Sequence, residues 1–297
     1  MIFFKKEEEF KKNPELKDED LNHLKEWLSK QPHLPHVNDE QLILFLHSCF
    51  YRLESTKATI ESYFTLRTHS PELFTKRDSD LKNVSDAFSI INFCLLSEST
   101  PEGDRVVLIQ GKELDPECFV LPDFIKALSM VLDMLLMTSG TFNGLIIVYD
   151  MKGFTLGHIG RMGIGMMKKY IFYLQEGLQA RLKAIHVINT VPIIDIINNM
   201  IKPFMKKELA EKQFYHVVGS EDIFKYIPRN IMPSDVGGTG KSIAIISDET
   251  FTKVKEMKSW FIEEEKFRVN EQKRPGKPKT ESDYFGMDGS FKTLSID

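Results

Sequence analysis

The chain has 297 residues, of which 42% are hydrophobic and 28% are charged, and its formal net charge is −4. This length predicts one large domain and a smaller one, and the charge gives no global basic field for binding nucleic acid. The three cysteines contain no CxxC pair, which argues against a disulfide framework and a zinc ribbon. We see no signal peptide and no apolar stretch of about 18 residues that could span a membrane. We therefore expect a cytoplasmic protein.

Residues 1–80 have the pattern of a small bundle of short helices. Leucines recur on one face of the segment 13–31, with charged residues on its other faces. Pro32 and Pro35 are expected to end that segment. Asn38 is expected to cap the next helix, because its side chain can accept a hydrogen bond from a free backbone N–H. We expect this region to form an N-terminal helical domain.

Residues 81–247 change character, because short β-branched runs alternate with helical patterns. Strands are expected at 104–111, between Gly144 and Gly153, at 182–190 and at the start of 212–227. Helices are expected at 122–139 and 159–178. Strands that alternate with helices favour a mostly parallel sheet with helices packed on it, so the fold class is α/β.

The C-terminal region, residues 248–297, is more polar than the rest. The segment 248–267 has the pattern of one amphipathic helix. The charged tail that follows contains glycine and proline, and its composition is typical of a segment that is extended on the surface or disordered.

Several motifs for catalysis or cofactors can be weighed and set aside. The segment 236–242, VGGTGKS, resembles a phosphate-binding loop, but Asp235 stands where that loop needs its first glycine. No HExxH motif or catalytic triad is present, and we expect no cofactor and no metal site. An enzyme would have to use Asp150 at a strand end or His186 within a strand. Turn capping and a hydrogen-bonded core position are the more common roles of such residues.

The segment 189–209, NTVPIIDIINNMIKPFMKKEL, is the most informative one on physical grounds. At helical spacing its large apolar side chains share one broad face, whereas asparagines and lysines lie on the opposite face. These seven side chains are Ile193, Ile194, Ile197, Met200, Ile201, Phe204 and Met205. At ~1.5–3 kcal/mol each, their burial is worth on the order of 10 kcal/mol or more. Pro203 should kink or split the helix. The face could pack permanently on the sheet or lie in a membrane surface.

Four motifs together resemble one family. They are GLIIVYDMKG at 144–153, IHVIN at 185–189, IKPF at 201–204 and PSDVGG at 233–238. They look like the CRAL-TRIO family of lipid-transfer proteins, in the branch that includes alpha-tocopherol transfer protein and cellular retinaldehyde-binding protein. The resemblance covers roughly residues 15–245. It implies a small helical domain, an α/β domain with one apolar cavity, and a mobile lid formed by the segment 189–209.

The resemblance also implies site residues. The cavity wall would consist of Phe124, Ala127, Val131, Leu145, Tyr149, Tyr170, Tyr173, Leu174, Leu178, Leu182, Ile185, Ile194, Ile197, Met200 and Ile201. Arg181 and Lys183 match two positions of the family's phosphoinositide-binding patch, and Lys206, Lys207 and Lys212 lie near others. The polar groups available to a ligand hydroxyl include Ser129, Tyr149, Thr190 and Asn198.

The function implied is that of a monomeric cytosolic carrier, peripheral to membranes and without catalysis. Its ligand would be an isoprenoid-like lipid such as a tocopherol, a retinoid or a carotenoid, which it would exchange at a membrane when the lid opens. The alternatives are a signalling adaptor that senses a bound lipid, a protein that exchanges phosphoinositides, and an enzyme.

Overall fold

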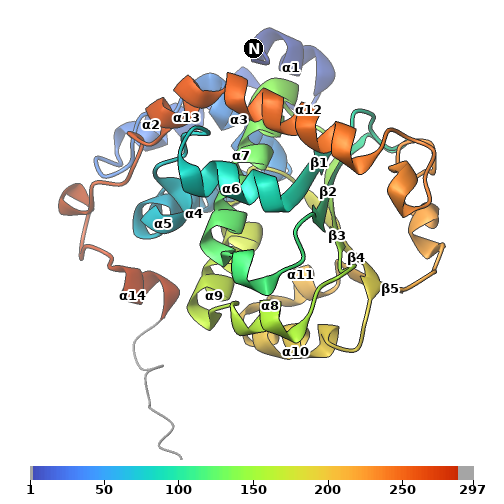
Figure 1. The fold of residues 1–297 in the computed structure, drawn as a ribbon. Coiled ribbons are helices and arrows are strands. Elements are labelled where there is room, and N and C mark those ends of the chain that lie inside the picture. The colour runs from blue at the N-terminus through green and yellow to red at the C-terminus, as the bar shows by residue number, and fades with distance from the viewer. Residues whose placement is uncertain (1–2, 287–297) are drawn as a thin grey trace, which may run out of the picture.

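The computed structural model describes residues 3–286 of the chain, and a five-stranded sheet lies at its centre (Figure 1). The strands follow one another in chain order across the sheet: β1 (Ile91–Leu95), β2 (Asp104–Gly111), β3 (Gly144–Asp150), β4 (Leu182–Thr190) and β5 (Gln213–Val217). The first pair is antiparallel and the others are parallel. The predicted α/β class with a mostly parallel sheet is therefore confirmed, whereas strand β1 was not predicted from the sequence.

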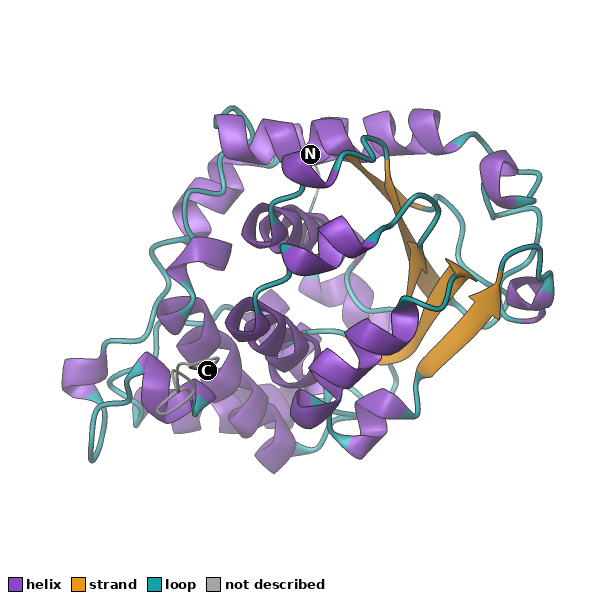
Figure 2. Cartoon of the chain, turned by 60° about the horizontal axis from the view of Figure 1, so that its bottom comes forward, coloured by secondary structure: helices purple, strands orange, loops and turns teal. Residues whose placement is uncertain are grey.

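Both faces of the sheet are covered, which explains why its inner strands are almost continuously apolar. Side chains alternate between the two faces with a period of two. On one face Val107 and Ile147 belong to the main hydrophobic cluster, whereas Val106 and Ile146 belong to a smaller cluster on the other face. Figure 2 shows most of the helices on one side of the sheet. The larger cluster therefore lies between the sheet and these helices.

The helices of the α/β domain and the C-terminal region are α6 (Lys82–Ile90), α7 (Leu121–Ser139), α8 (Leu156–Gly160), α9 (Ile164–Phe172), α10 (Ile194–Ile201), α11 (Lys207–Ala210), α12 (Ile243–Glu256), α13 (Lys258–Glu264) and α14 (Glu281–Phe285). Helix α7 is buried along nearly its whole length, and Gly140, with a φ of +66°, ends it. The predicted helix at 122–139 is thus confirmed. Among residues 3–286, none of the helices combines the length and the apolarity that crossing a bilayer requires.

The N-terminal region is the predicted helical bundle. It consists of α1 (Lys6–Lys12), α2 (Asp18–Ser29), α3 (Asp39–Ser48), α4 (Leu53–His69) and α5 (Pro71–Phe74). These helices enclose a hydrophobic cluster of their own, which includes Leu21, Leu24 and Phe45. The Asn38 side chain accepts a hydrogen bond of 2.9 Å from the Gln41 backbone N–H, so the predicted cap of α3 is confirmed.

Two predicted helices are divided in the structure. The segment 159–178 contains the end of α8, then α9, and finally a π-helical turn over Tyr173–Gly177. Gly163 precedes α9 in an extended conformation, which explains the first break. The helix expected at 248–267 is divided into α12 and α13 at the buried residue Met257, where no glycine or proline marks the boundary.

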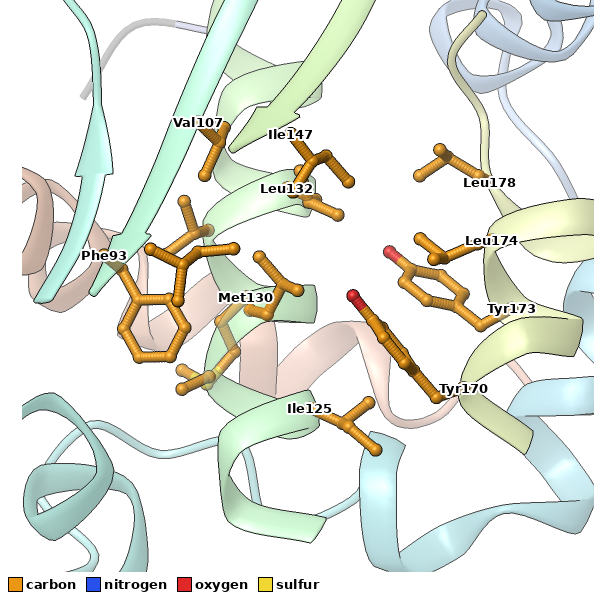
Figure 3. Packing of buried hydrophobic residues seen from close by; sticks show 14 of the residues in the cluster. Phe93, Val107, Ile125, Met130, Leu132, Ile147, Tyr170, Tyr173, Leu174 and Leu178 are labelled. Atoms are coloured by element: carbon orange, nitrogen blue, oxygen red, sulfur yellow. The ribbon is translucent and has the colours of Figure 1, made fainter. Parts of the chain in front are cut away.

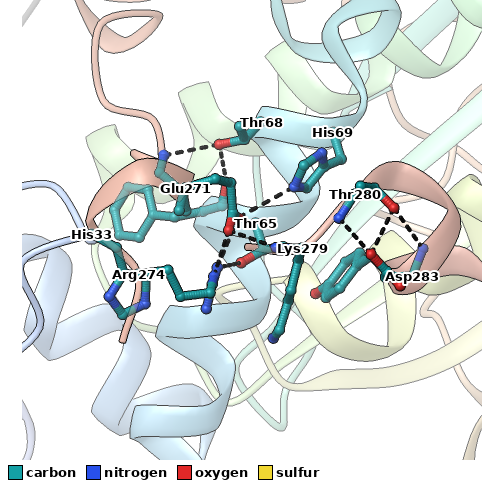
Figure 4. A network of polar contacts seen from close by, with 12 residues as sticks. His33, Thr65, Thr68, His69, Glu271, Arg274, Lys279, Thr280 and Asp283 are labelled. Atoms are coloured by element: carbon teal, nitrogen blue, oxygen red, sulfur yellow. Dashed lines mark hydrogen bonds and ion pairs between the residues drawn. The ribbon is translucent and has the colours of Figure 1, made fainter. Parts of the chain in front are cut away.

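The C-terminal tail is packed against the molecule as far as residue 286. Between α13 and α14 it runs over the surface mostly without regular secondary structure, which fits the expected extended segment. Arg274 forms an ion pair with Glu271 (Figure 4), and it forms another with Glu61 of α4. A capping box at Thr280 begins α14, and Phe285 is buried. These charges satisfy one another, so a polar composition did not prevent a fixed position. The rest of the predicted tail, 287–297, lies outside the described residues.

A cluster of buried ions joins three segments that are far apart in the sequence. Arg67 of α4 contacts Asp133 of α7 at 2.8 Å and Glu264 of α13 at 3.2 Å. Arg77 contacts the same two carboxylates. All four side chains are at most 3% exposed. The two arginines hold the pKa of Glu264 at about 2, although burial itself opposes this shift. The cluster therefore fixes α4, α7 and α13 against one another.

Candidate functional site

A cavity of about 190 Å³ lies within the main hydrophobic cluster, between the sheet and the helices α7, α9 and α10. Ile109, Tyr149, Ile185 and Val187 line it from three neighbouring strands. These residues share the period-two face of the sheet that points away from the smaller cluster. The sheet therefore provides one apolar wall that is fixed by the hydrogen bonds between its strands.

The helices provide the opposite walls. The cavity is lined by Phe124 of α7, by Tyr170 of α9 and by Leu174 of the turn after α9. Figure 3 shows Tyr170, Tyr173 and Leu174 directed toward α7 and the sheet. Methionine and aromatic side chains make adaptable apolar surfaces, and Met162 and Met167 also belong to the lining. Such a wall suits a ligand that is recognised mainly by its shape and apolarity.

Helix α10 covers the cavity with the apolar face expected from the sequence. Ile194, Ile197 and Ile201 line the cavity, whereas Ile196 on another side of the helix is 47% exposed. Helix α10 ends at Ile201, and a single 3₁₀ turn, which contains Pro203, follows. The predicted break at the proline is confirmed, because proline cannot continue the hydrogen-bonding pattern of a helix.

Polar contacts hold this covering segment at two places. The Tyr215 hydroxyl of β5 donates a hydrogen bond of 2.8 Å to the Asn198 side chain of α10. The Gln175 side chain bonds to the backbone of Phe204 at 3.1 Å and to that of Lys206 at 2.6 Å. Each place is at the surface or only partly buried. The remaining contacts of α10 with the protein are mostly apolar, so the segment is held chiefly by burial of its isoleucines.

Two tyrosines provide polar groups inside the cavity. The hydroxyls of Tyr149 on β3 and Tyr170 on α9 form a hydrogen bond with each other. Burial raises the pKa of Tyr149 and of Tyr170 well above their ordinary values, so both phenols are neutral at physiological pH. They are therefore hydrogen-bonding groups and not bases.

The residues predicted for the cavity wall fall into two groups. Those that line the cavity are Phe124, Tyr149, Tyr170, Leu174, Ile185, Ile194, Ile197 and Ile201. Those that belong to the surrounding hydrophobic cluster or pack against it are Ala127, Val131, Leu145, Tyr173, Leu178, Leu182 and Met200. The structure thus places both groups in one region, with the second group around the first.

Sequence reasoning missed a further part of the lining. The cavity is also lined by Ile90 at the end of α6, by Ile91 at the start of β1, and by Leu114 and Phe119 in the connection between β2 and α7. Only a correct prediction of β1 could have placed Ile91 there, and loop residues such as Leu114 have no periodicity that would indicate burial. Asn198, one of the polar groups expected near a ligand, also lines the cavity, whereas Ser129 and Thr190 bond to backbone carbonyls elsewhere.

The predicted basic residues have several different environments. Arg181 donates a hydrogen bond of 2.7 Å to the His47 carbonyl and lies over the Phe50 ring, so it joins the N-terminal bundle to the α/β domain. Lys183 pairs with Asp104, and Lys206 pairs with Glu176. The remaining two, Lys207 and Lys212, lie at and after α11, where Lys207 pairs with Glu211 at 3.6 Å.

Each of the two residues considered for catalysis has structural partners of its own. Asp150 accepts hydrogen bonds from Gln110 and Asn189 and from the backbone of Lys152, so it organises the turn after β3. His186 is fully buried on the face of the sheet that points away from the cavity, and it bonds to His216 at 2.9 Å. Within residues 3–286, we find no group of three or more His, Cys, Asp or Glu side chains able to hold a metal ion.

Comparisons with known proteins agree with this organisation. Residues 13–84 match the family described as Pinta-like UBA domain, and residues 92–238 match the CRAL/TRIO domain. The alpha-tocopherol transfer protein-like proteins of Mus musculus and Homo sapiens are 29% identical to the chain over 261 and 262 residues. These alignments cover 84% of this chain and 75% of each relative.

More distant similarities were also found. Clavesin-1 of Mus musculus is 21% identical over 234 residues, which cover 78% of this chain and 66% of that protein. The crystal structure of Sfh5 superposes with a TM-score of 0.46 and 15% identity, over 70% of this chain and 74% of that chain.

Proposed function

This chain belongs to the CRAL/TRIO family, and we propose that it is a carrier that binds one hydrophobic lipid in its cavity and exchanges it at membranes. The observation that supports this most directly is an apolar cavity covered by a helix whose inner face is also apolar. Such a site recognises a hydrocarbon by burial and offers little to a polar substrate. The protein acts as a monomer in the cytoplasm and contacts membranes only transiently.

The ligand is an isoprenoid-like lipid such as a tocopherol, a retinoid or a carotenoid. The relatives at 29% identity are named for alpha-tocopherol transfer, which supports this class. Burial of about twenty carbons at ~0.8 kcal/mol each gives up to ~16 kcal/mol before the losses on ordering. Such a lipid leaves into water very slowly, so its delivery requires direct contact with an acceptor membrane.

The size of the cavity supports a covering segment that moves. Pockets for drug-sized ligands have volumes of roughly 300–1,000 Å³, whereas the cavity beneath α10 has about 190 Å³. A lipid of twenty carbons therefore requires an outward displacement of one wall. Helix α10 is the wall that is held mainly by apolar contacts, and we propose that the segment from α10 to α11 is the lid.

The surface near the lid has the composition of a membrane-docking surface. Ile196 of α10, Leu156 of α8 and Ile164 of α9 are 47%, 65% and 60% exposed, and Figure 1 shows the three helices at the same end of the molecule. Exposed apolar side chains at one end can insert into a bilayer surface. We propose that contact with a bilayer replaces the contacts that the lid makes with the cavity.

Anionic headgroups are the proposed polar partners at this membrane. Lys206 and Lys207 are 62% and 85% exposed and follow the lid directly, and Lys212 lies just beyond them. Arg181 and Lys183 are also proposed to contact phosphoinositides, after exchange of the partners that they have in the structure. Each lysine close to an anionic surface contributes about 1 kcal/mol, and salt weakens this attraction.

A vesicle assay tests the proposed function. Donor vesicles that contain fluorescent tocopherol or retinol are mixed with acceptor vesicles and with catalytic amounts of the protein. We expect transfer at a rate proportional to protein concentration, and faster transfer to anionic acceptors than to neutral ones. Transfer no faster than in the absence of protein contradicts the carrier function. Equal rates on neutral and anionic vesicles would remove only the phosphoinositide contact.

A further inference from the structure

The hydroxyls of Tyr149 and Tyr170 are polar groups inside the cavity, and the proposed carrier function assigns them no role. Tyr149 reaches the cavity from the sheet and Tyr170 from α9, so the pair bridges two walls. Figure 3 shows the Tyr170 hydroxyl directed from α9 into the interior. The tyrosine rings lie among isoleucine, leucine and phenylalanine side chains, which have no hydrogen-bonding groups to offer.

The two hydroxyls cannot satisfy all of their hydrogen-bonding groups with each other. A phenol has one O–H to donate and can also accept. One hydroxyl of the pair donates to the other, which leaves the second O–H without an acceptor. In the part of the chain that the structure describes, neither hydroxyl has another hydrogen-bond partner. A buried donor without an acceptor costs about 1–3 kcal/mol, so the empty cavity contains a donor that a ligand oxygen can satisfy.

Other polar side chains around the cavity already have partners. Asp150 accepts three hydrogen bonds from Gln110, Asn189 and the Lys152 backbone. Asn198 accepts from Tyr215 at 2.8 Å in an exposed contact, where water can satisfy its own N–H groups. His158 is bonded to Thr155 within the capping box of α8. These groups hold the walls together, whereas the tyrosine pair points at the space between the walls.

We propose that the Tyr149–Tyr170 pair is the polar anchor of the lipid site, and that it selects a lipid with one hydrogen-bond-accepting oxygen over a pure hydrocarbon. The oxygen belongs to a hydroxyl, carbonyl or ether group, and the remainder of the ligand is hydrocarbon. This inference rests on the proposed carrier function and narrows its ligand class. Because both phenols stay neutral, they donate to a neutral oxygen without a charge having to be buried.

A matched pair of probes tests the anchor. Phytol and phytane share the same branched carbon skeleton of twenty atoms, and only phytol has a hydroxyl. We expect the wild-type protein to bind phytol about tenfold more tightly than phytane, which corresponds to about 1.4 kcal/mol. The double variant Tyr149→Phe/Tyr170→Phe keeps both rings, and it should lose the preference for phytol, because the phytol hydroxyl then has no tyrosine partner in the cavity.

The single variants separate an anchor from a merely structural pair. Tyr149→Phe or Tyr170→Phe leaves one hydroxyl free to donate, so each single variant should lose less than about threefold in phytol affinity. The double variant should therefore lose far more than the two singles combined. Tyr226→Phe, which removes the hydroxyl of a 42% exposed tyrosine outside the cavity lining, is the control and should leave the preference for phytol unchanged.

The outcomes distinguish this inference from the carrier function. Equal wild-type affinities for phytol and phytane, or an equal loss of both in the double variant, would overturn the anchor while leaving the carrier function intact. Binding of neither lipid by folded wild-type protein contradicts the carrier function, and the anchor with it. Thermal unfolding of each variant shows whether the protein is folded. If the double variant is not folded, the wild-type preference for phytol over phytane still tests the anchor.

Discussion

The walls of the cavity differ in the interactions that hold them. One side is fixed, whereas the contacts of α10 on the other, exchangeable side can be replaced by contacts with a bilayer. On the fixed side, α7 contributes Phe124 to the cavity wall. Away from the lining, a buried cluster of charges holds α7 against α4 and α13, and it consists of Arg67, Arg77, Asp133 and Glu264. At the other side, the isoleucines of α10 pack on the cavity. A bilayer can replace the apolar partners of α10, because hydrocarbon is as good a partner for isoleucine as another side chain. It cannot replace the partners of buried ions, since separating them leaves unpaired charges.

Breaking the fixed side should give the largest effect on stability. Asp133→Asn keeps the shape of the side chain but removes the charge that both arginines contact. We expect the free energy of unfolding in urea to fall by about 3–5 kcal/mol, because the buried guanidinium groups lose a counter-charge. The control is Asp86→Asn in the exposed pair with Lys82, which should cost less than about 1 kcal/mol. Similar losses in both variants would show that the cluster does not fix this side.

Acid should also destabilise the fixed sheet, in a defined pH window. Burial lowers the pKa of His186 from 6.5 to about 4, and the neighbouring His216 lowers it further in the same direction. Between pH 6.5 and 4 the unfolded chain carries the extra proton, so the free energy of unfolding decreases as the pH falls through this window. The loss is on the order of a few kcal/mol.

The variant His186→Gln tests this assignment, because it removes the titrating group and keeps a polar side chain. Urea unfolding at pH 7 and pH 4.5 should differ less in the variant than in wild type. Glu264 has a pKa of about 2 in the folded protein and 4.5 in its ordinary state. The stability that it contributes is therefore lost only as the pH falls from about 4.5 to about 2. An unchanged difference between pH 7 and pH 4.5 in His186→Gln would mean that other groups cause the acid sensitivity.

Changing the exchangeable side should affect ligand retention more than stability. Ile194→Asp places a carboxylate on the face of α10 that covers the cavity, and burying this charge is unfavourable. We expect dissociation of the bound lipid to become about tenfold faster or more, with a smaller loss of stability than in Asp133→Asn. Ile196→Asp, on the exposed side of the same helix, should retain the lipid in solution. Equal retention in both variants would indicate that α10 does not close the cavity.

The smallest expected effect is that of the polar contact between the lid and the sheet edge. Tyr215→Phe keeps the ring but removes the hydroxyl, which lies 2.8 Å from the Asn198 side chain and 2.6 Å from the Gln213 side chain and donates to one of them. Because Tyr215 is 42% exposed, water replaces the lost partner in part. We expect the closed position of the lid to be destabilised by about 0.5 kcal/mol. The rate of lipid dissociation, measured by stopped-flow fluorescence, should then increase roughly twofold. A larger increase in the dissociation rate than that caused by Ile194→Asp would mean that polar contacts, and not the apolar ones, chiefly hold the lid.

The same contrast explains what could be predicted from the sequence. The face of α10 was predicted, because Ile194, Ile197 and Ile201 recur within one short segment at helical spacing. The tyrosine pair was not, since Tyr149 and Tyr170 are 21 positions apart on a strand and a helix. Arg67 and Asp133, 66 positions apart, likewise leave no local pattern. Periodicity reports which face is buried, whereas polar contacts between elements depend on how those elements pack.

Strand β1 was not predicted, and the contacts that hold the C-terminal tail could not be predicted, for related reasons. Ile91 follows α6 directly, without a glycine or proline that would indicate a change of structure. The tail is polar in composition, and its position depends on ion pairs such as that between Arg274 and Glu61. Composition alone cannot show that such charges find partners within the chain.

The most direct test of the account is native mass spectrometry of the protein after incubation with vesicles that contain alpha-tocopherol, all-trans-retinal and beta-carotene. The protein is separated from the vesicles before measurement, and the bound lipid is then extracted and identified. We predict a mass increase equal to one lipid molecule per chain, and an oxygen-bearing lipid in preference to beta-carotene. Folded protein that shows only its own mass after incubation with these vesicles would contradict the claim that this cavity holds a lipid.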